Sequence, residues 1–332
     1  GGCIRDSILG RNPDDWDITT SAVPSQIKTF FKRTVDTGIA HGTVTIMIDK
    51  TGYEVTTYRI DGEYEDGRHP KSVEFSDRLV DDLCRRDFTI NAMAYNDTDG
   101  FVDEFKGLDD LDAKIIRCVG EPELRFTEDA LRMMRAIRFS AQLGFTIDEA
   151  TWNAIKKLSP SISKISMERV HVELGKTLMS AHPDYVAQYS EAGLFAPILP
   201  VIDNALKSRY KRKILATLQH TPDNIYLRYA ALFITSTPDE TAKTLRALKL
   251  DNKTVDTVSK LVELSKMDIE ETEPAVRTAL NKYGRDFLPL WHELMMAVIQ
   301  ASEDITGISN PAKVKHLLTL KRLATDILAR GD

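Results

Sequence analysis

The spacing of apolar residues changes once along this chain, and that change limits the folds open to it. Up to about residue 117, alternating apolar and polar residues mark short strands among short helices. From Thr127 onward the apolar residues recur at helical spacing, and residues 147 to 332 form successive helical segments separated by prolines. The sequence therefore predicts an α+β fold, in which an N-terminal part with a small mixed β-sheet and helices precedes an all-helical part.

Composition excludes few classes of function. A chain of 332 residues is long enough for more than one domain. Its net charge of −6 means that a nucleic acid would have to bind local basic patches. No apolar run is long enough to span a bilayer, so we expect no membrane partner. The three cysteines lack the spacing of a zinc site and fit a cytoplasmic protein.

Two aspartates stand two positions apart near the start of the chain. Alternation from Asp15 to Thr20 predicts a strand, which would place the carboxylates of Asp15 and Asp17 on one face. Neighbouring carboxylates repel one another unless a cation lies between them, and Mg²⁺ with a polyphosphate is the usual solution. Residues 12 to 15 also have the composition of a turn, so a simple acidic turn is the alternative.

A glycine pair and an arginine precede these two carboxylates. Gly1 and Gly2 lack side chains, which would let backbone N–H groups approach phosphates closely. Arg5 lies beside them and offers a positive charge. The first twenty residues therefore combine groups suited to phosphate with groups suited to a divalent cation.

Glu54 is a third acid in an unusual position. Residues 43–48 and 53–58 predict two strands of a hairpin, joined by a turn at residues 49–52. Glu54 is flanked in the second strand by apolar residues, unlike a solvated charge. It is either a functional acid or an edge-strand charge that guards against aggregation.

The run from Asp81 to Ala92 contains a second dense group of polar residues. Arg86 offers a guanidinium fork for phosphate, and Asp87 offers an acceptor for a ribose hydroxyl. The alternative is that the two form an ordinary surface ion pair. Asp87 is also expected to cap a short helix that buries Ile90 and Met93.

A longer helix, predicted from an N-cap at Thr127 to Gly144, carries charged residues beside its apolar stripe. Arg132, Arg135 and Arg138 each follow an apolar residue, so they should flank the buried stripe. Asp129 and Arg132 are neighbours on the helix surface, where they would form a simple salt bridge.

The same pair of side chains could also read a nucleotide base. A carboxylate accepts from an exocyclic amine, and a guanidinium donates to a ring nitrogen. Cytosine and adenine present these two groups side by side, whereas uracil and guanine present a carbonyl and an N–H. A mismatch would leave a buried group unpaired at about 1–3 kcal/mol. Asp129 and Arg132 would thus select C and A without a nucleic acid template.

The densest basic run covers residues 207–213 and includes Tyr210. A solvated helix face is the ordinary interpretation of such a run. An RNA-backbone contact is the more specific alternative.

Together these motifs resemble those of the class II nucleotidyltransferases. That group includes the CCA-adding tRNA nucleotidyltransferases and the bacterial poly(A) polymerases. The runs that carry the resemblance are Gly-Gly-Cys-Ile-Arg-Asp, Asp-Trp-Asp-Ile-Thr-Thr, Arg-Arg-Asp-Phe-Thr-Ile-Asn-Ala and Glu-Asp-Ala-Leu-Arg. The resemblance implies addition of C, C and A to the 3′ end of tRNA from CTP and ATP, with Mg²⁺ as cofactor.

The resemblance also assigns roles to single residues. Asp15 and Asp17 would hold Mg²⁺, with Glu54 as the third catalytic carboxylate. Asp129 and Arg132 would read the base, while Arg135 and Arg138 would face the triphosphate or the RNA end. The full set of expected nucleotide-binding residues is Gly2, Arg5, Arg86, Asp87, Asp129, Arg132, Arg135 and Arg138.

Four parts are expected from the same resemblance. These are a catalytic head at residues 1–117, a base-recognition neck at 118–180, an RNA-binding body at 181–265 and an incomplete tail at 266–332. The polar segment 60–70 matches a flexible loop that takes part in switching from C to A addition. A helix and a strand precede the glycine pair in the family, so we expect further residues before Gly1.

Two other functions stay open. One is a poly(A) polymerase or an A-adding enzyme built on the same frame. The other is a nucleotide-binding RNA module without catalysis. The intact set of carboxylates argues against this second alternative, because a binder gains nothing from repulsive acids beside phosphate.

Overall fold

The computed structural model of the chain describes residues 1–13, 15–62 and 72–330. The chain divides into two compact units: residues 1–136 with 145–164, and residues 137–144 with those from 165 onward. All the strands of the described residues lie in the first unit, and the second unit is helical. This confirms the predicted α+β class. The expected four-part division is finer than these two units and remains a prediction.

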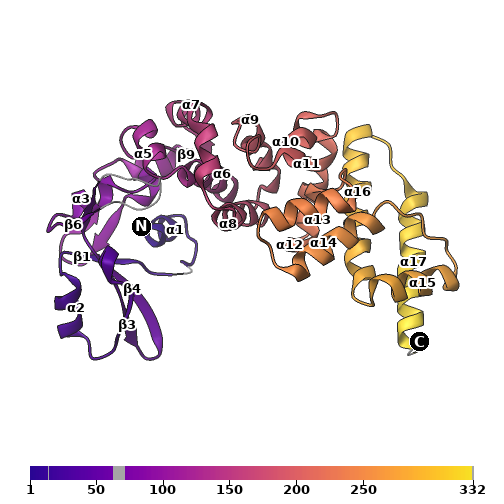
Figure 1. The fold of residues 1–332 in the computed structure, drawn as a ribbon, viewed down its shortest axis with the longest axis horizontal. Coiled ribbons are helices and arrows are strands. Elements are labelled where there is room, and N and C mark those ends of the chain that lie inside the picture. The colour runs from indigo at the N-terminus through magenta and orange to yellow at the C-terminus, as the bar shows by residue number, and fades with distance from the viewer. Residues whose placement is uncertain (14, 63–71, 331–332) are drawn as a thin grey trace. The chain divides into compact units, whose positions relative to one another are not determined.

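The main sheet of the first unit is mixed, as expected (Figure 1). Its first strand runs parallel to its neighbour, and the other pairs are antiparallel. The strands in order across the sheet are β1 (Ile18–Thr20), β4 (Thr51–Thr57), β3 (Thr43–Ile48) and β2 (Thr34–Gly38).

The hairpin of β3 and β4 is confirmed, with a tighter turn than predicted. Asp49 and Lys50 both adopt positive φ, 46° and 69°, and form a two-residue connection. Such turns match the right-handed twist of the flanking strands. The second strand therefore begins at Thr51, two residues before the predicted start.

Helix α2 (Pro24–Phe30) has two buried residues, Pro24 and Ile27. Ile27 forms a cluster with Val44, Ile46 and Val55. Phe30, in the last turn of this helix, is 75% exposed.

The rest of the first unit consists of short elements. Residues 101 to 119 hold a helix between two small two-stranded ladders. The elements outside the main sheet are α1 (Gly2–Ile8), β5 (Arg59–Asp61), β6 (Val73–Phe75), α3 (Leu79–Cys84), a 3₁₀ turn at Thr89–Asn91, β7 (Ala94–Asn96), β8 (Gly100–Val102), α4 (Gly107–Asp112), β9 (Ile115–Ile116), α5 (Pro122–Glu128), β10 (Thr146–Ile147) and α7 (Glu149–Leu158).

Helix α6 (Leu131–Leu143) starts in the first unit and ends in the second. The second unit continues with α8 (Met167–Leu178), α9 (Ala187–Glu191), α10 (Pro200–Lys207), α11 (Lys211–His220), α12 (Ile225–Leu232), α13 (Pro238–Ala247), α14 (Asn252–Leu264), α15 (Glu273–Tyr283), α16 (Phe287–Thr306) and α17 (Pro311–Ala329).

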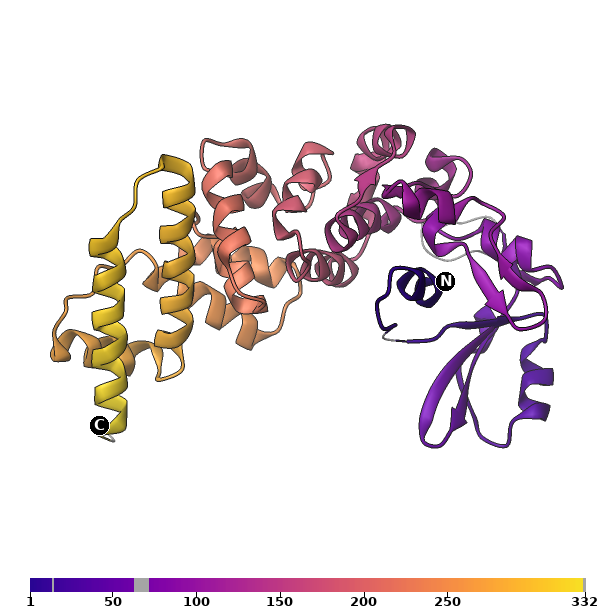
Figure 2. The same ribbon diagram turned by 180° about the vertical axis from the view of Figure 1, so that it is seen from behind.

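Prolines begin several of these helices, as the sequence predicted. Pro200 and Pro238 occupy first helical positions, where a missing backbone N–H is harmless. In α13 a capping box between Thr237 and Glu240 completes the start. Helices α16 and α17 run side by side, as both views show (Figure 2). None of the helices described is long and apolar enough to cross a membrane.

Candidate functional site

Asp15 and Asp17 lie in the segment that leads into β1, not in the strand itself. Pairing with β4 begins only at Ile18, so the predicted strand is too long at its start. Both carboxylates are exposed, and Trp16 between them is 51% exposed. Where a strand begins depends on its partner, which the alternation of the sequence does not reveal. Asp14 lies outside the described residues.

Glu54 lies on β4, next to the residue that pairs with the start of β1. Ile18 pairs with Val55 in a parallel register, so Asp17 comes to the level of Glu54. Val55 is buried and Glu54 exposed, on opposite faces of the strand. β4 lies between β1 and β3, but its pairing with β1 begins at Val55, so Glu54 pairs only with Thr45 of β3 and both explanations of Glu54 stay open.

The three acids do not converge into a preformed metal cage. Across the residues that the structure describes, no group of three or more His, Cys, Asp or Glu side chains is placed to hold a metal ion. The donor set is nevertheless of the right kind, because exposed carboxylate oxygens are the ligands that Mg²⁺ prefers.

The glycine pair lies against Arg86 and Asp17. A Cβ atom placed on Gly1 would lie 3.2 Å from Nη1 of Arg86 and 4.0 Å from Oδ2 of Asp17. Glycine therefore permits a close approach that a side chain would obstruct. This contact brings together the two motifs that the sequence singled out, although they are about 70 residues apart.

Arg5 is buried and already engaged. Its Nη1 donates to Oδ1 of Asn91 at 2.6 Å, and its Nε and Nη2 donate to the carboxylate of Asp6 at 3.0 and 2.8 Å. Arg5 thus ties α1 to the 3₁₀ turn that contains Asn91. Its expected contact with triphosphate remains a prediction.

Arg86 is only half-buried, and two of its nitrogen atoms are engaged. Nη2 donates to Oδ2 of Asp82 at 3.1 Å, and Nη1 donates to the carbonyl oxygen of Asn91 at 3.3 Å. Asp82 also binds Arg85. No local pattern of the sequence points to Asp82, because its partner Thr19 lies 63 residues earlier in the chain.

Asp87 is buried and does not form the surface pair with Arg86 that we weighed. Its Oδ1 accepts from the backbone N–H of Phe88 and from Nδ2 of Asn91, and its Oδ2 accepts from Nε of Arg135 at 2.7 Å. Burial alone would raise the pKa of this carboxyl group. The charge and hydrogen bonds of Arg135, together with Asn91, outweigh burial and lower that pKa to about 2.

The short helix expected after Asp87 is present as a 3₁₀ turn. It covers Thr89–Asn91, and Ile90 and Met93 are both fully buried, as predicted. Asp87 therefore organises a buried turn. Its expected contact with a ribose hydroxyl remains a prediction.

The helix expected from Thr127 is interrupted at Asp129. Thr127 lies inside α5, where its hydroxyl donates to the carbonyl of Glu123, so it is not the predicted N-cap. Asp129 has extended backbone angles, and its Oδ1 accepts from the backbone N–H of Leu131 at 3.0 Å. Asp129 thus caps the start of α6, as aspartates commonly do.

Arg132 is held by groups on two other elements. Its Nη1 donates to Oε2 of Glu128 at 2.5 Å, and its Nη2 donates to the carbonyl oxygen of Arg85 at 3.0 Å. The side chain is 12% exposed. Arg132 is therefore fixed beside the segment that contains Arg86, and its base-reading role remains a prediction.

Arg138 departs from the position expected for it. It is 6% exposed, and its Nε donates to Oε2 of Glu173 on α8 at 2.5 Å while its Nη1 donates to Gln142. It lies within the second unit and contacts protein groups, not an open surface.

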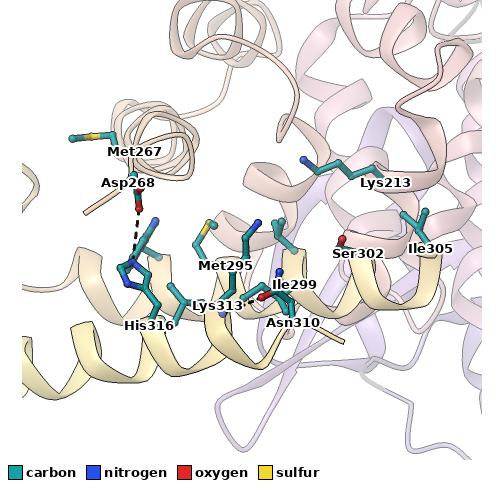
Figure 3. Close-up of a pocket in the computed structure, with 13 residues that line it drawn as sticks. Lys213, Met267, Asp268, Met295, Ile299, Ser302, Ile305, Asn310, Lys313 and His316 are labelled. Atoms are coloured by element: carbon teal, nitrogen blue, oxygen red, sulfur yellow. Dashed lines mark hydrogen bonds and ion pairs between the residues drawn. The ribbon is translucent and has the colours of Figure 1, made fainter. Parts of the chain in front are cut away.

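A separate cavity of about 550 Å³ lies in the second unit (Figure 3). Met295 and Ile299 of α16 form part of its apolar wall, and Lys213, Lys313 and His316 lie around it. None of the predicted site residues lines this cavity. The predicted loop at residues 60–70 falls largely on residues 63–71, outside the described part of the chain.

Comparisons with known proteins agree with this arrangement of motifs. Residues 1–117 match the Poly A polymerase head domain. Residues 144–206 match the family described as "Probable RNA and SrmB-binding site of polymerase A".

Two curated relatives show how much of the chain is shared. The CCA-adding enzyme of Limosilactobacillus reuteri is 49% identical over 210 residues, which is 62% of this chain and 51% of that protein. The chain thus spans about half the length of this relative. The CCA-adding enzyme of Streptococcus suis is 38% identical over 329 residues, 96% of this chain and 78% of that protein.

A solved structure extends the likeness to the fold. The crystal structure of the Bacillus stearothermophilus CCA-adding enzyme in complex with CTP has a TM-score of 0.73 at 33% identity. The match covers 98% of this chain and 77% of that one. With these similarities across nearly its whole length, the chain belongs to the family of CCA-adding enzymes.

Proposed function

We propose that this protein adds C, C and A to the 3′ end of tRNA from CTP and ATP, without a nucleic acid template and with release of pyrophosphate. The observation that carries the proposal is the close approach of the first two motifs. Gly1 lies beside both Arg86 and Asp17, so a phosphate-binding arginine adjoins an acid suited to a divalent cation. The family membership supports the same reaction.

Mg²⁺ is the proposed cofactor, and Asp15, Asp17 and Glu54 would hold it. Their carboxylates are exposed, and the register of β1 and β4 brings Asp17 level with Glu54. When bound, Mg²⁺ would lower the pKa of the tRNA 3′-hydroxyl and offset the charge that develops on the phosphates.

The proposed triphosphate site uses one half-buried group and two buried ones. Arg86, beside Gly1, would bind the triphosphate directly. Arg5 and Asp87 both form hydrogen bonds with the side chain of Asn91. We therefore propose that they fix the position of the turn that contains Asn91. Such preorganisation avoids reorganising charged groups when the substrate binds.

Base selection is proposed to rest on Asp129 and Arg132. One oxygen of Asp129 caps α6, which fixes the carboxylate that would accept from the amine of C or A. Glu128 and the carbonyl of Arg85 orient Arg132. Arg135 would act through Asp87, and Arg138 would stabilise the end of α6.

The wider proposal includes the partners and the layout of the chain. The tRNA acceptor end would be the RNA substrate, and the head, neck, body and tail would follow the boundaries 1–117, 118–180, 181–265 and 266–332. The cytoplasm would be the site of action, in keeping with three cysteines that are all free.

The test is nucleotide incorporation into a tRNA that ends just before CCA, with each nucleoside triphosphate supplied singly and Mg²⁺ present. We expect CTP to be incorporated, ATP to extend only a tRNA that ends in CC, and UTP and GTP to be rejected. Long A tracts from ATP alone would favour a poly(A) polymerase. Binding of CTP without any incorporation would favour a non-catalytic module.

A further inference from the structure

Asp82 on α3 has no solvent exposure at all, and it contacts Arg86 of the proposed triphosphate site. Its Oδ1 accepts from Nε and Nη2 of Arg85 at 2.9 and 2.5 Å. Its Oδ2 accepts from Nη2 of Arg86 at 3.1 Å and from the hydroxyl of Thr19 at 3.4 Å. A buried carboxylate is costly unless charged or polar groups bind it, and here two arginines and one threonine do so.

These partners connect α3 to the strand that follows the proposed metal-binding acids. Thr19 belongs to β1 and stands two residues after Asp17. Arg86 and the Asp17 carboxylate each lie close to Gly1. Asp82 therefore links Arg86 to β1, the strand that follows directly after Asp17.

An arginine that must bind a phosphate gains from being held in place beforehand. A free arginine side chain loses rotamer freedom on binding, and a fixed one has already lost it. Two of the three nitrogens of the Arg86 guanidinium have protein partners, Asp82 and the carbonyl of Asn91, and Nε is buried with none. Asp82 is the only one of these partners with a charge.

We infer that Asp82 is a positioning residue of the nucleotide site, which holds the Arg86 guanidinium beside Gly1 for contact with a triphosphate. The inference rests on the proposed function, because it assumes that Arg86 meets the triphosphate. The sequence motifs assign no role to Asp82.

A purely structural role for Asp82 makes a different prediction, and Asp110 provides the matched control. Asp110 is 7% exposed, and its carboxylate accepts from the hydroxyl of Thr89 at 2.7 Å and from Nε of Arg117 at 3.2 Å. It is thus another buried carboxylate bound to an arginine and a threonine in the same unit. Its hydrogen bonds do not involve Arg86.

The experiment compares the affinities for CTP and CMP by equilibrium dialysis, in the parent, Asp82→Asn and Asp110→Asn. Thermal unfolding of each protein is measured alongside. We expect both substitutions to lower the melting temperature. Only Asp82→Asn should lower the ratio of CTP affinity to CMP affinity, by about tenfold, because CMP lacks the phosphates that Arg86 would bind.

Two further variants make the test independent of how well Asp82→Asn folds. Thr19→Val keeps the side-chain shape and removes only one donor to Asp82, so it should lower the same ratio by about twofold. In an Arg86→Ala background, Asp82→Asn should change the ratio no further, because the two residues act as a unit.

An unchanged ratio in every Asp82 and Thr19 variant that folds would overturn the inference, as would an equal drop in Asp110→Asn. A parent that binds CTP no more tightly than CMP would overturn the proposed triphosphate site as well. A normal preference for CTP in the parent, with unaltered ratios in the variants, would overturn the role of Asp82 alone.

Discussion

Arg135 and Asp87 form an ion pair that joins helix α6 to the second sequence motif, with Nη2 of Arg135 2.7 Å from Oδ2 of Asp87. The carboxylate also accepts from Asn91, whose own side-chain oxygen accepts from Arg5 on α1. One line of hydrogen bonds thus runs from the first helix of the chain to the helix proposed to read the base. All of these residues belong to the first unit.

The first prediction concerns the stability that Asp87 provides and its dependence on pH. The pKa of Asp87 is about 2 in the folded protein and 3.8 in its ordinary state, so its contribution is present above 3.8 and is lost as pH falls through 2. The free energy of unfolding of the parent should exceed that of Asp87→Asn by about 2 kcal/mol near pH 7 and by about half of that near pH 3.

Urea unfolding of the two proteins at a series of pH values measures this difference. Asp36→Asn is the control, because Asp36 forms an exposed pair with Lys28. A gap between the parent and Asp87→Asn that stays constant from pH 7 to pH 3 would show that the carboxylate is not held ionised by Arg135.

The second prediction concerns the buried pair of Arg138 and Glu173, whose side chains are 7% and 5% exposed. Replacing one partner leaves the other charge buried alone, so Arg138→Met should lower the free energy of unfolding by about 3–5 kcal/mol. The double variant with Glu173→Leu should recover most of that loss.

Chemical denaturation of the single and double variants measures these changes in the free energy of unfolding. The exposed pair of Lys157 and Glu123 gives the control, and Lys157→Ala should change stability by less than about 1 kcal/mol. If the double variant is no more stable than Arg138→Met, the two side chains do not compensate one another.

The third prediction concerns the proposed cation site. Asp15→Asn should lower nucleotide incorporation at least about a thousandfold while the melting temperature stays near that of the parent, because the carboxylate is exposed. Chelation by EDTA should abolish incorporation by the parent, and added Mg²⁺ should restore it. Near-normal turnover of Asp15→Asn would refute the metal role.

The fourth prediction concerns base choice. Asp129→Ala and Arg132→Ala should each narrow the preference for C and A over U and G by about tenfold or more, with residual incorporation retained. Single-nucleotide incorporation rates for the four nucleoside triphosphates provide the measurement. Glu123→Ala, an exposed acid of α5, is the control and should leave the preference unchanged. Retained selectivity in both variants would place base reading elsewhere.

Local patterns in the sequence predicted the elements that depend on local chemistry. The turn at Asp49 and Lys50 and the helix starts at Pro200 and Pro238 follow from neighbouring residues. The spacing of apolar residues also predicted the α+β class and the mixed sheet. It did so because the change from alternating to helical spacing extends over many residues.

Positions that depend on a distant partner could not be predicted in this way. The start of β1 is set by β4, more than 30 residues later. An arginine beside an apolar stripe can be exposed to solvent or form a buried ion pair. Arg138 is buried because Glu173, on another helix, forms an ion pair with it. The burial of Asp82 likewise depends on Thr19.

The most direct test of the account is a single reaction that contains a tRNA ending just before CCA, CTP, ATP and Mg²⁺, with the products sequenced. It is run with the parent and with Asp17→Asn. We expect the parent to add C, C and A in that order and then stop, and the variant to add nothing. Addition of an A tract by the parent, or equal products from the parent and Asp17→Asn, would contradict the account.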